Sequence, residues 1–194
     1  MTALRRLRLR REEGFTLVEL LIAMIVLTIG ILALVAAYTS GYVALNRATR
    51  VSSAEVLADS QMERFRALTY SSIQLNTTCG ALCNVDSTYT SDAVYNATAR
   101  VSGCSSSTES TCLPIQTKPG PDGRSYRMET FIEYSCPVST DTLTISPLSC
   151  GTGEPSPVKT VTVVVTASAA STGLGTNTPV SVREQSAFTS LTGQ

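Results

Sequence analysis

Apolar and polar positions along the first part of the chain predict one long helix. Residues 15–37 carry a single charge, that of Glu19. As a helix they would extend about 35 Å, enough to cross the roughly 30 Å hydrocarbon core of a bilayer. Beyond them, apolar side chains recur at three- and four-residue steps: Ala44, Ala48, Val51, Ala54, Ala58, Met62, Phe65 and Leu68 or Thr69. No proline interrupts the pattern, so we expect one helix from about residue 15 to 72, with residues 50–70 packed against a sheet.

The second part of the chain has the pattern of strands. Four stretches alternate in polarity or are rich in β-branched residues: 95–101, which has the weakest pattern, 126–134, 158–166 and 181–189. In the second stretch one face carries Tyr126, Met128, Thr130, Ile132 and Tyr134, and the other carries Arg127, Glu129 and Glu133.

Turn and loop signals separate these stretches. Residues 118–123 predict a turn, and residues 174–179 predict a link that joins the last two strands as an antiparallel pair. Residues 77–112 are expected to be mostly loop. A long helix followed by a run of strands predicts an α+β fold, with the helix on one face of an antiparallel sheet.

The six cysteines all follow the apolar run and lie in loops rich in Ser, Thr, Gly and Pro. An even number in this context predicts three disulfides in an oxidising compartment, although the connectivity stays open. We favour the local pairs Cys79–Cys83, Cys104–Cys112 and Cys136–Cys150. A zinc site is less favoured, because the chain has no histidine and the Cys79–Cys83 spacing has no second tight pair.

Charge is concentrated in the first residues, where five arginines precede position 12: Arg5, Arg6, Arg8, Arg10 and Arg11. These arginines predict that the N-terminus stays in the cytoplasm, which puts the cysteines outside. Removal of residues 1–14 would leave ten basic and thirteen acidic residues, a net charge of −3. A nucleic-acid partner is therefore not predicted, since phosphate binding depends on basic surface.

Three interpretations of the apolar segment compete. It could be a secretory signal peptide cut after Val35-Ala36-Ala37, although its apolar core is longer than the usual 7–15 residues. It could be a plain signal anchor. It could also follow a specialised leader that is cut before the apolar run, which would keep that run in the mature protein.

Catalytic chemistry is not predicted, and neither is a metal or cofactor. Without histidine the chain has no Ser-His-Asp or Cys-His arrangement, and it has no G-x-S-x-G, H-E-x-x-H or phosphate-binding glycine loop. The loop acids Asp86, Asp92 and Asp122 lack the spacing of a calcium site. The triplets that begin at Asn76 and Asn96 fit the N-glycosylation pattern, which we expect to be a chance match.

Residues 14–38, GFTLVELLIAMIVLTIGILALVAAY, resemble the N-terminal signature of type IV pilins and pseudopilins. The matching positions are Gly14, Phe15, Thr16, Leu17, Val18 and Glu19. The stretches MIVLTIGILAL and QMERFRALTYSSI resemble V-type minor pilins, and the later strands are similar to the sheet of bacterial minor pilins. Three positions depart from the common pattern. Glu12 and Glu13 precede the glycine, where family leaders often carry Lys or Arg, and Ala36 stands where many major pilins have proline.

The resemblance implies a domain organisation and a set of partners. Residues 1–14 would be a leader, 15–38 a transmembrane and assembly helix, 39–75 its amphipathic continuation, and 76–194 an extracytoplasmic disulfide-rich β domain. A prepilin peptidase/N-methyltransferase would cleave between Gly14 and Phe15 and methylate Phe15. The other implied partners are pilin subunits, the pilus assembly platform and the cytoplasmic membrane, which the chain would span once before joining an extracellular pilus.

The resemblance also gives Glu19 a role. A carboxylate in hydrocarbon costs up to ~3 kcal/mol at the centre of a helix, and a nearby ammonium offsets this cost. In the family that ammonium is the N-terminal amine of a neighbouring subunit. Glu19 could instead extend to the membrane interface, or pair with its own Phe15 amine on the same helical face. The expected function is a minor pilin; the alternatives are a pseudopilin of a type II secretion system and an anchored surface domain that does not polymerise.

Overall fold

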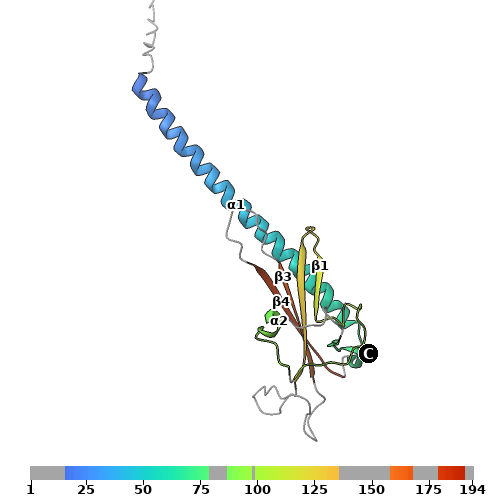
Figure 1. Cartoon of the computed structure of the whole chain (residues 1–194). Helices are drawn as coiled ribbons and strands as arrows, with labels where there is room; N and C mark the ends of the chain where they lie inside the picture. Colours follow the sequence, from blue (N-terminus) through green and yellow to red (C-terminus); the bar gives the residue numbers. More distant parts are fainter. Residues whose placement is uncertain (1–15, 79–86, 98, 136–157, 168–178, 191–194) are drawn as a thin grey trace, which may run out of the picture. The chain divides into compact units, whose positions relative to one another are not determined.

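The computed structural model of the chain describes residues 16–78, 87–97, 99–135, 158–167 and 179–190. The chain divides into two compact units, residues 1–45 and 46–194. One long helix, α1 (Leu17–Arg66), begins in the first unit and ends in the second, which also contains a four-stranded sheet (Figure 1). A long helix followed by an antiparallel sheet confirms the predicted α+β class.

The part of α1 in the first unit is apolar on every side. All of residues 16–45 are exposed, and α1 is long and apolar enough to cross a membrane. Both threonines within the helical part of this segment bond to the helix backbone: Thr28 Oγ1 donates to Met24 O at 2.7 Å, and Thr39 Oγ1 donates to Ala36 O at 3.0 Å. Because both hydroxyl groups have hydrogen-bond partners within the helix, they are compatible with hydrocarbon, where no water can replace a missing partner.

The helix ends earlier than the sequence predicts, at Arg66 rather than near residue 72. Thr69 has an extended backbone, with φ −69° and ψ 151°, and a single 3₁₀ turn, η1 (Tyr70–Ser72), follows it. Lys159 Nζ donates to the carbonyl oxygens of Tyr70 and Ile73 at 2.7 and 2.9 Å. A distant side chain therefore holds the turn, and apolar spacing within the helix could not reveal it.

The sheet is an antiparallel meander in the order β1-β2-β3-β4. Its strands are β1 (Ile115–Pro119), β2 (Ser125–Ser135), β3 (Val158–Ala167) and β4 (Val180–Phe188). The register places Met128 opposite Val165, and Val163 opposite Glu184. The last three strands confirm the sequence prediction within two residues at each end, including the antiparallel pairing of β3 with β4.

The sequence does not predict β1. Its residues, Ile-Gln-Thr-Lys-Pro, show no apolar alternation, and their last two positions fall in the predicted turn. A proline is tolerated here because β1 is an edge strand. The turn itself comes after Pro119, where Gly120 N–H donates to Arg124 O at 2.7 Å and Gly123 adopts φ 73°.

The described residues of this segment, 95–97 and 99–101, do not form a strand, so that prediction is wrong. Asn96 Oδ1 accepts a hydrogen bond from Ala99 N–H at 3.4 Å, which bends the segment locally. The segment then joins β2 at an isolated bridge between Arg100 and Glu133. The remaining described residues of the 77–112 region are mostly loop, as expected, apart from the short helix α2 (Ser87–Thr90).

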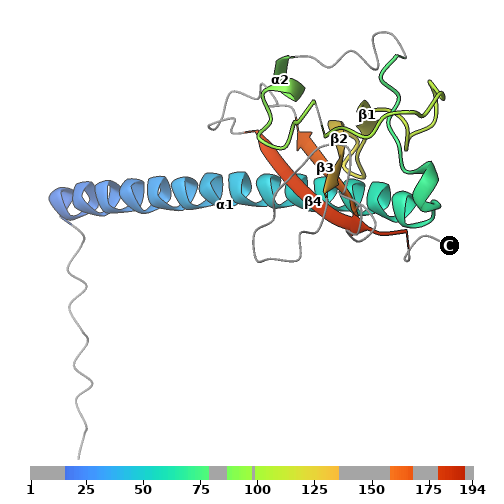
Figure 2. The same ribbon diagram turned by 90° about the horizontal axis from the view of Figure 1, so that it is seen from below.

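The main core lies between the later part of α1 and one face of the sheet (Figure 2). The buried residues of the predicted helical stripe are Ala54, Ala58, Met62 and Phe65, and they pack on Tyr126, Met128, Ile132, Val161, Val163 and Val165. Ala44 and Ala48 continue the stripe but are exposed. The prediction of packing against a sheet in residues 50–70 is therefore confirmed.

The opposite face of the sheet carries a second, smaller core that the sequence does not predict. Phe131 stacks on Tyr89 of α2 with ring centroids 4.3 Å apart, and both pack with Val164. Tyr89 Oη donates to Thr130 O at 2.9 Å, which fixes α2 to β2. Figure 2 shows the sheet between the later part of α1 and α2.

Candidate assembly site

The first turn of α1 carries the residues of the predicted assembly site that the structure describes. Thr16 precedes the helix; its Oγ1 accepts Glu19 N–H at 3.3 Å and its carbonyl accepts Leu20 N–H at 3.2 Å. Thr16 is therefore the N-cap residue, and Glu19 stands three residues later, at the spacing of a capping box. A carboxylate in the first helical turn is stabilised by the helix dipole.

The scissile bond of the predicted processing site lies outside the described residues, because the structure describes neither Gly14 nor Phe15. The N-cap at Thr16 fixes where the helix begins. A chain cut before Phe15 would thus present its new amine one residue before the cap. The sequence separation from that amine to Glu19 is one helical turn.

The surface around Glu19 is apolar, and no residue that the structure describes covers it. Leu17 is 77% exposed and Val18 is 62% exposed, and large apolar side chains remain exposed along the helix as far as Leu45. A soluble monomer rarely exposes an apolar patch of more than a few hundred Å². This surface therefore calls for lipid or for other apolar helices around it.

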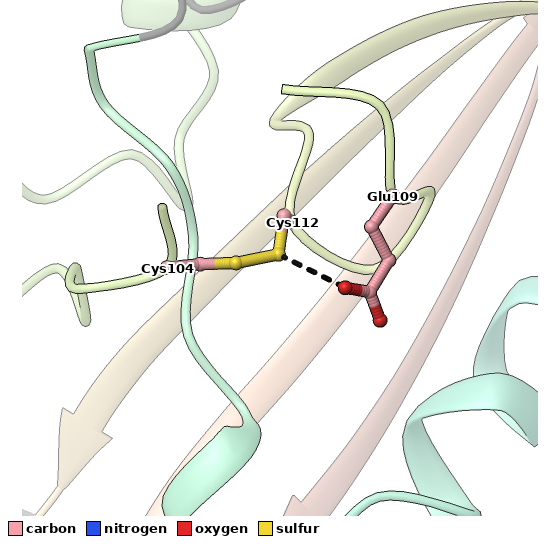
Figure 3. A group of neighbouring side chains, drawn as sticks. All are labelled: Cys104, Glu109 and Cys112. Atoms are coloured by element: carbon pink, nitrogen blue, oxygen red, sulfur yellow. Dashed lines mark hydrogen bonds between the residues drawn. A yellow bond between two sulfur atoms is a disulfide. The ribbon is translucent and has the colours of Figure 1, made fainter. Parts of the chain in front are cut away.

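A disulfide bond closes the loop that precedes β1. Cys104 and Cys112 form a disulfide with Cα atoms 5.8 Å apart, which confirms that predicted pair (Figure 3). Glu109 lies beside it, with Oε2 3.8 Å from Cys112 Sγ. Because both sulfurs are bonded to each other, this group offers no thiolate to a metal. The other predicted cysteines, Cys79, Cys83, Cys136 and Cys150, lie outside the described residues.

A polar network joins the disulfide loop to α1 and β1. Gln61, which is 1% exposed, donates from Nε2 to Ser110 O at 2.8 Å, and Gln116 Nε2 donates to the same carbonyl at 2.6 Å. Ser110 Oγ lies 2.8 Å from the side-chain oxygen of each glutamine and accepts from Lys118 Nζ at 2.6 Å. The sequence does not predict this network. Its one local sign is Gln61, a glutamine beside the apolar stripe of the helix.

Lys159 is a buried cation that the sequence does not single out. It is 2% exposed, and its Nζ lies 4.5 Å from the ring centroid of Tyr70 and 5.8 Å from that of Tyr134. Burial lowers the pKa of Lys159 below its ordinary value. The two carbonyl acceptors and the aromatic faces compensate for the lost hydration of the ammonium.

The loop acids considered as calcium ligands have protein partners where the structure describes them. Both oxygens of Asp92 accept from Arg183 Nη2 at 2.8 Å. Asp122 accepts from Tyr126 Oη at 2.8 Å. Asp86 lies outside the described residues.

The two glycosylation triplets also have a structural context. Asn76 is 2% exposed; its Nδ2 donates to Ser106 O at 2.8 Å, and its Oδ1 accepts Thr78 N–H at 2.8 Å. A sugar on Asn76 would displace these contacts in the folded protein. Asn96 is half-buried and shapes the loop described above.

Comparison with protein families finds one match. Residues 9–35 match the family model described as the prokaryotic N-terminal methylation motif. Comparisons with curated proteins and with solved structures found no match. The matched region contains the whole segment from Gly14 to Glu19, and it identifies the N-terminal region as that of a type IV pilin-like protein, with a fold that fits.

Proposed function

We propose that this chain is a minor pilin, a subunit built into a type IV pilus through its apolar helix. The observation that carries the proposal is Glu19. It is the only charged residue among residues 16–45, it lies one turn into a capped helix, and it falls within the matched methylation motif.

Processing would prepare the chain for assembly. A prepilin peptidase/N-methyltransferase would cut between Gly14 and Phe15 and methylate the new amine of Phe15. Glycine before the cut supports this, because it lets an enzyme approach the backbone closely. The cut would also remove the arginine-rich leader, so that only Glu19 and the new amine remain charged near the first turn.

Glu19 would then select a neighbouring subunit. Its carboxylate is costly in hydrocarbon, and the Phe15 amine of an adjacent chain would neutralise it. Pairing of this kind sets the axial register between apolar helices that otherwise slide without preference. The chain performs no catalysis in this scheme, in keeping with the structural role of proteins that carry the motif.

The membrane orientation follows from charge and cysteine chemistry. The leader arginines favour a cytoplasmic N-terminus, and the Cys104–Cys112 disulfide favours an oxidising compartment for the sheet. Before assembly α1 would anchor the chain in the lipid of the cytoplasmic membrane, where the assembly platform would contact it. After assembly the sheet would be exposed on an extracellular fibre.

A pseudopilin of a type II secretion system is the second candidate, because the methylation motif supports it equally. The two differ in the fibre that the chain enters: one carries it to the cell surface and the other does not. An anchored domain that never polymerises would keep the chain in the membrane fraction.

Substitution of Glu19 tests the proposal. We expect Glu19→Gln to be inserted and cleaved normally but to enter sheared surface filaments at least about tenfold less than wild type, which corresponds to ~1.4 kcal/mol per subunit. Glu55→Gln, an exposed position on the same helix, is the matched control and should assemble normally. Normal assembly of Glu19→Gln would contradict the role of the carboxylate, and wild type absent from surface filaments would favour the other two candidates.

A further inference from the structure

Three arginines gather near the point at which the apolar run of α1 ends. Arg47 and Arg50 follow Leu45 and lie one helical turn apart, so they are neighbours on the helix surface. Arg124 lies in the turn between β1 and β2. We call Arg47, Arg50 and Arg124 the arginine cluster; all three belong to the second unit.

The turn that carries Arg124 is fixed beside this part of α1 (Figure 1). Tyr126 Oη lies 3.5 Å from Arg50 O and donates to Asp122 Oδ2 at 2.8 Å. The same carboxylate oxygen lies 3.8 Å from Arg124 Nε. The fold therefore holds the turn that carries Arg124 beside the backbone of Arg50, one helical turn from Arg47.

The arginine cluster keeps most of its positive charge. Neither Arg47 nor Arg50 forms an ion pair with any residue that the structure describes, and Arg50 Nε is buried without a hydrogen-bond partner there. Asp122 is the one described carboxylate paired with the cluster, and it also accepts from Tyr126 Oη. Among the described residues Asp122 pairs with Arg124 alone, so the cluster carries an excess of positive charge that favours an external anion.

Distance along α1 places the cluster at the level of lipid headgroups. With Glu19 at one edge of the roughly 30 Å hydrocarbon core, α1 reaches the other edge near Thr39, and Arg47 follows about 12 Å further along the helix, on the headgroup side. Tyr38 and Tyr42 precede the cluster and are 76% and 61% exposed. Tyrosines at this position are typical of the aromatic belt at a membrane interface.

We propose that the arginine cluster binds the phosphate groups of anionic phospholipids in the leaflet at which α1 leaves the membrane. Guanidinium groups hold phosphate oxygens in a bidentate geometry, and a phosphate would neutralise the positive charge of Arg47 and Arg50, which form no ion pair with a described residue. The inference rests on the proposed function only for the membrane span of α1. It requires neither leader cleavage nor polymerisation.

Lipid-dependent stability tests this inference. The full chain is placed in nanodiscs of phosphatidylcholine alone or of phosphatidylcholine with phosphatidylglycerol, and thermal unfolding of the sheet is followed by circular dichroism. We expect the wild-type midpoint to be about 3–8 °C higher with phosphatidylglycerol. The variant Arg47→Gln/Arg50→Gln should lose most of this difference, and the control Arg64→Gln/Arg66→Gln, which removes two charges from the far end of the same helix, should keep it.

Each other outcome has a defined meaning. The inference is overturned if the variant and its control respond alike to phosphatidylglycerol, or if millimolar inorganic phosphate raises the midpoint in phosphatidylcholine as much as the lipid does. Failure of the chain to enter nanodiscs would refute the membrane span, and with it both proposals. Normal insertion without any lipid dependence would refute the arginine cluster alone.

Discussion

A single residue, Lys159, holds the 3₁₀ turn that follows the long helix. Its ammonium binds the carbonyl oxygens of Tyr70 and Ile73, in and just after the 3₁₀ turn η1. The chain has only two lysines, and both are held by internal contacts rather than by solvent. The same side chain covers apolar surface with its methylene groups.

Substitution of Lys159 should therefore act on stability. We expect Lys159→Met to lower the free energy of unfolding by about 1–3 kcal/mol, because the apolar stem is kept while two buried carbonyls lose their donor. Urea unfolding of the full chain in detergent measures this, with Arg64→Met as an exposed control on α1. Equal stability of Lys159→Met and wild type would show that the ammonium contributes nothing to the turn.

Asp92 and Arg183 predict a pH dependence. Burial raises the pKa of Asp92, but the hydrogen bonds from Arg183 and from Val94 N–H outweigh burial and hold the pKa below the ordinary 3.8. Between the lowered pKa and pH 3.8, the folded chain therefore binds fewer protons than the unfolded chain. The stabilisation is present above pH 3.8 and is lost as the pH falls through the lowered pKa.

Asp92→Asn measures this contribution. Because Arg183 is 40% exposed and solvent screens the pair, we expect a loss of only about 1 kcal/mol at neutral pH. The difference between the variant and wild type should shrink as the pH falls below 3.8. A difference in unfolding free energy that stays constant from neutral to strongly acidic pH would mean that the carboxylate charge is not responsible.

At the scale of the element, the disulfide loop connects α1 to the edge of the sheet. The Cys104–Cys112 bond closes the loop, and Ser110 within it meets Gln61 from α1 and Gln116 from β1. Loss of the bond should thus loosen a contact between elements as well as the loop itself.

The double variant Cys104→Ser/Cys112→Ser should be less stable by about 2–3 kcal/mol, the value expected for a short closed loop. Hydrogen exchange should then increase in residues 104–112 and at Gln61 more than in the central strands. Gln61→Leu, with the disulfide intact, is the comparison that separates the network from the covalent bond. Unchanged exchange at Gln61 after loss of the disulfide would show that the two are independent.

Elements with a regular local period could be predicted from the sequence, and elements held by distant partners could not. The stripe from Ala54 to Phe65 has helical spacing, and β3 is β-branched nearly throughout, so both elements were predictable. The sequence of β1 shows no alternation of apolar and polar residues, and this strand forms through its pairing with β2. The second core was not predictable, because Phe131 shares its face of β2 with charged residues in the sequence pattern. Only the fold places Tyr89 over Phe131.

The candidate site divides in the same way. Thr16 and Glu19 belong to one local motif, so their cap geometry follows from spacing alone. The Cys104–Cys112 pair was predictable because it is close in sequence. The arginine cluster joins residues more than seventy positions apart, and only the fold brings them together.

At the scale of the whole molecule, the two units place different demands on their surroundings. The first unit exposes apolar side chains on every side of α1 and needs lipid or other helices. The second unit has its own core on both faces of the sheet. Under the proposed function, such a chain would be an anchored monomer before assembly and a subunit packed among like helices afterwards.

The central claim is that the chain is processed at Gly14 and then assembled through Glu19, and the N-terminus of the cellular protein tests the first step most directly. We predict that intact mass and N-terminal sequencing of the protein from membrane and sheared filament fractions will give a chain that starts at methylated Phe15. A protein that keeps its arginine-rich leader, or one cut after Ala37 and released without its apolar helix, would contradict the account.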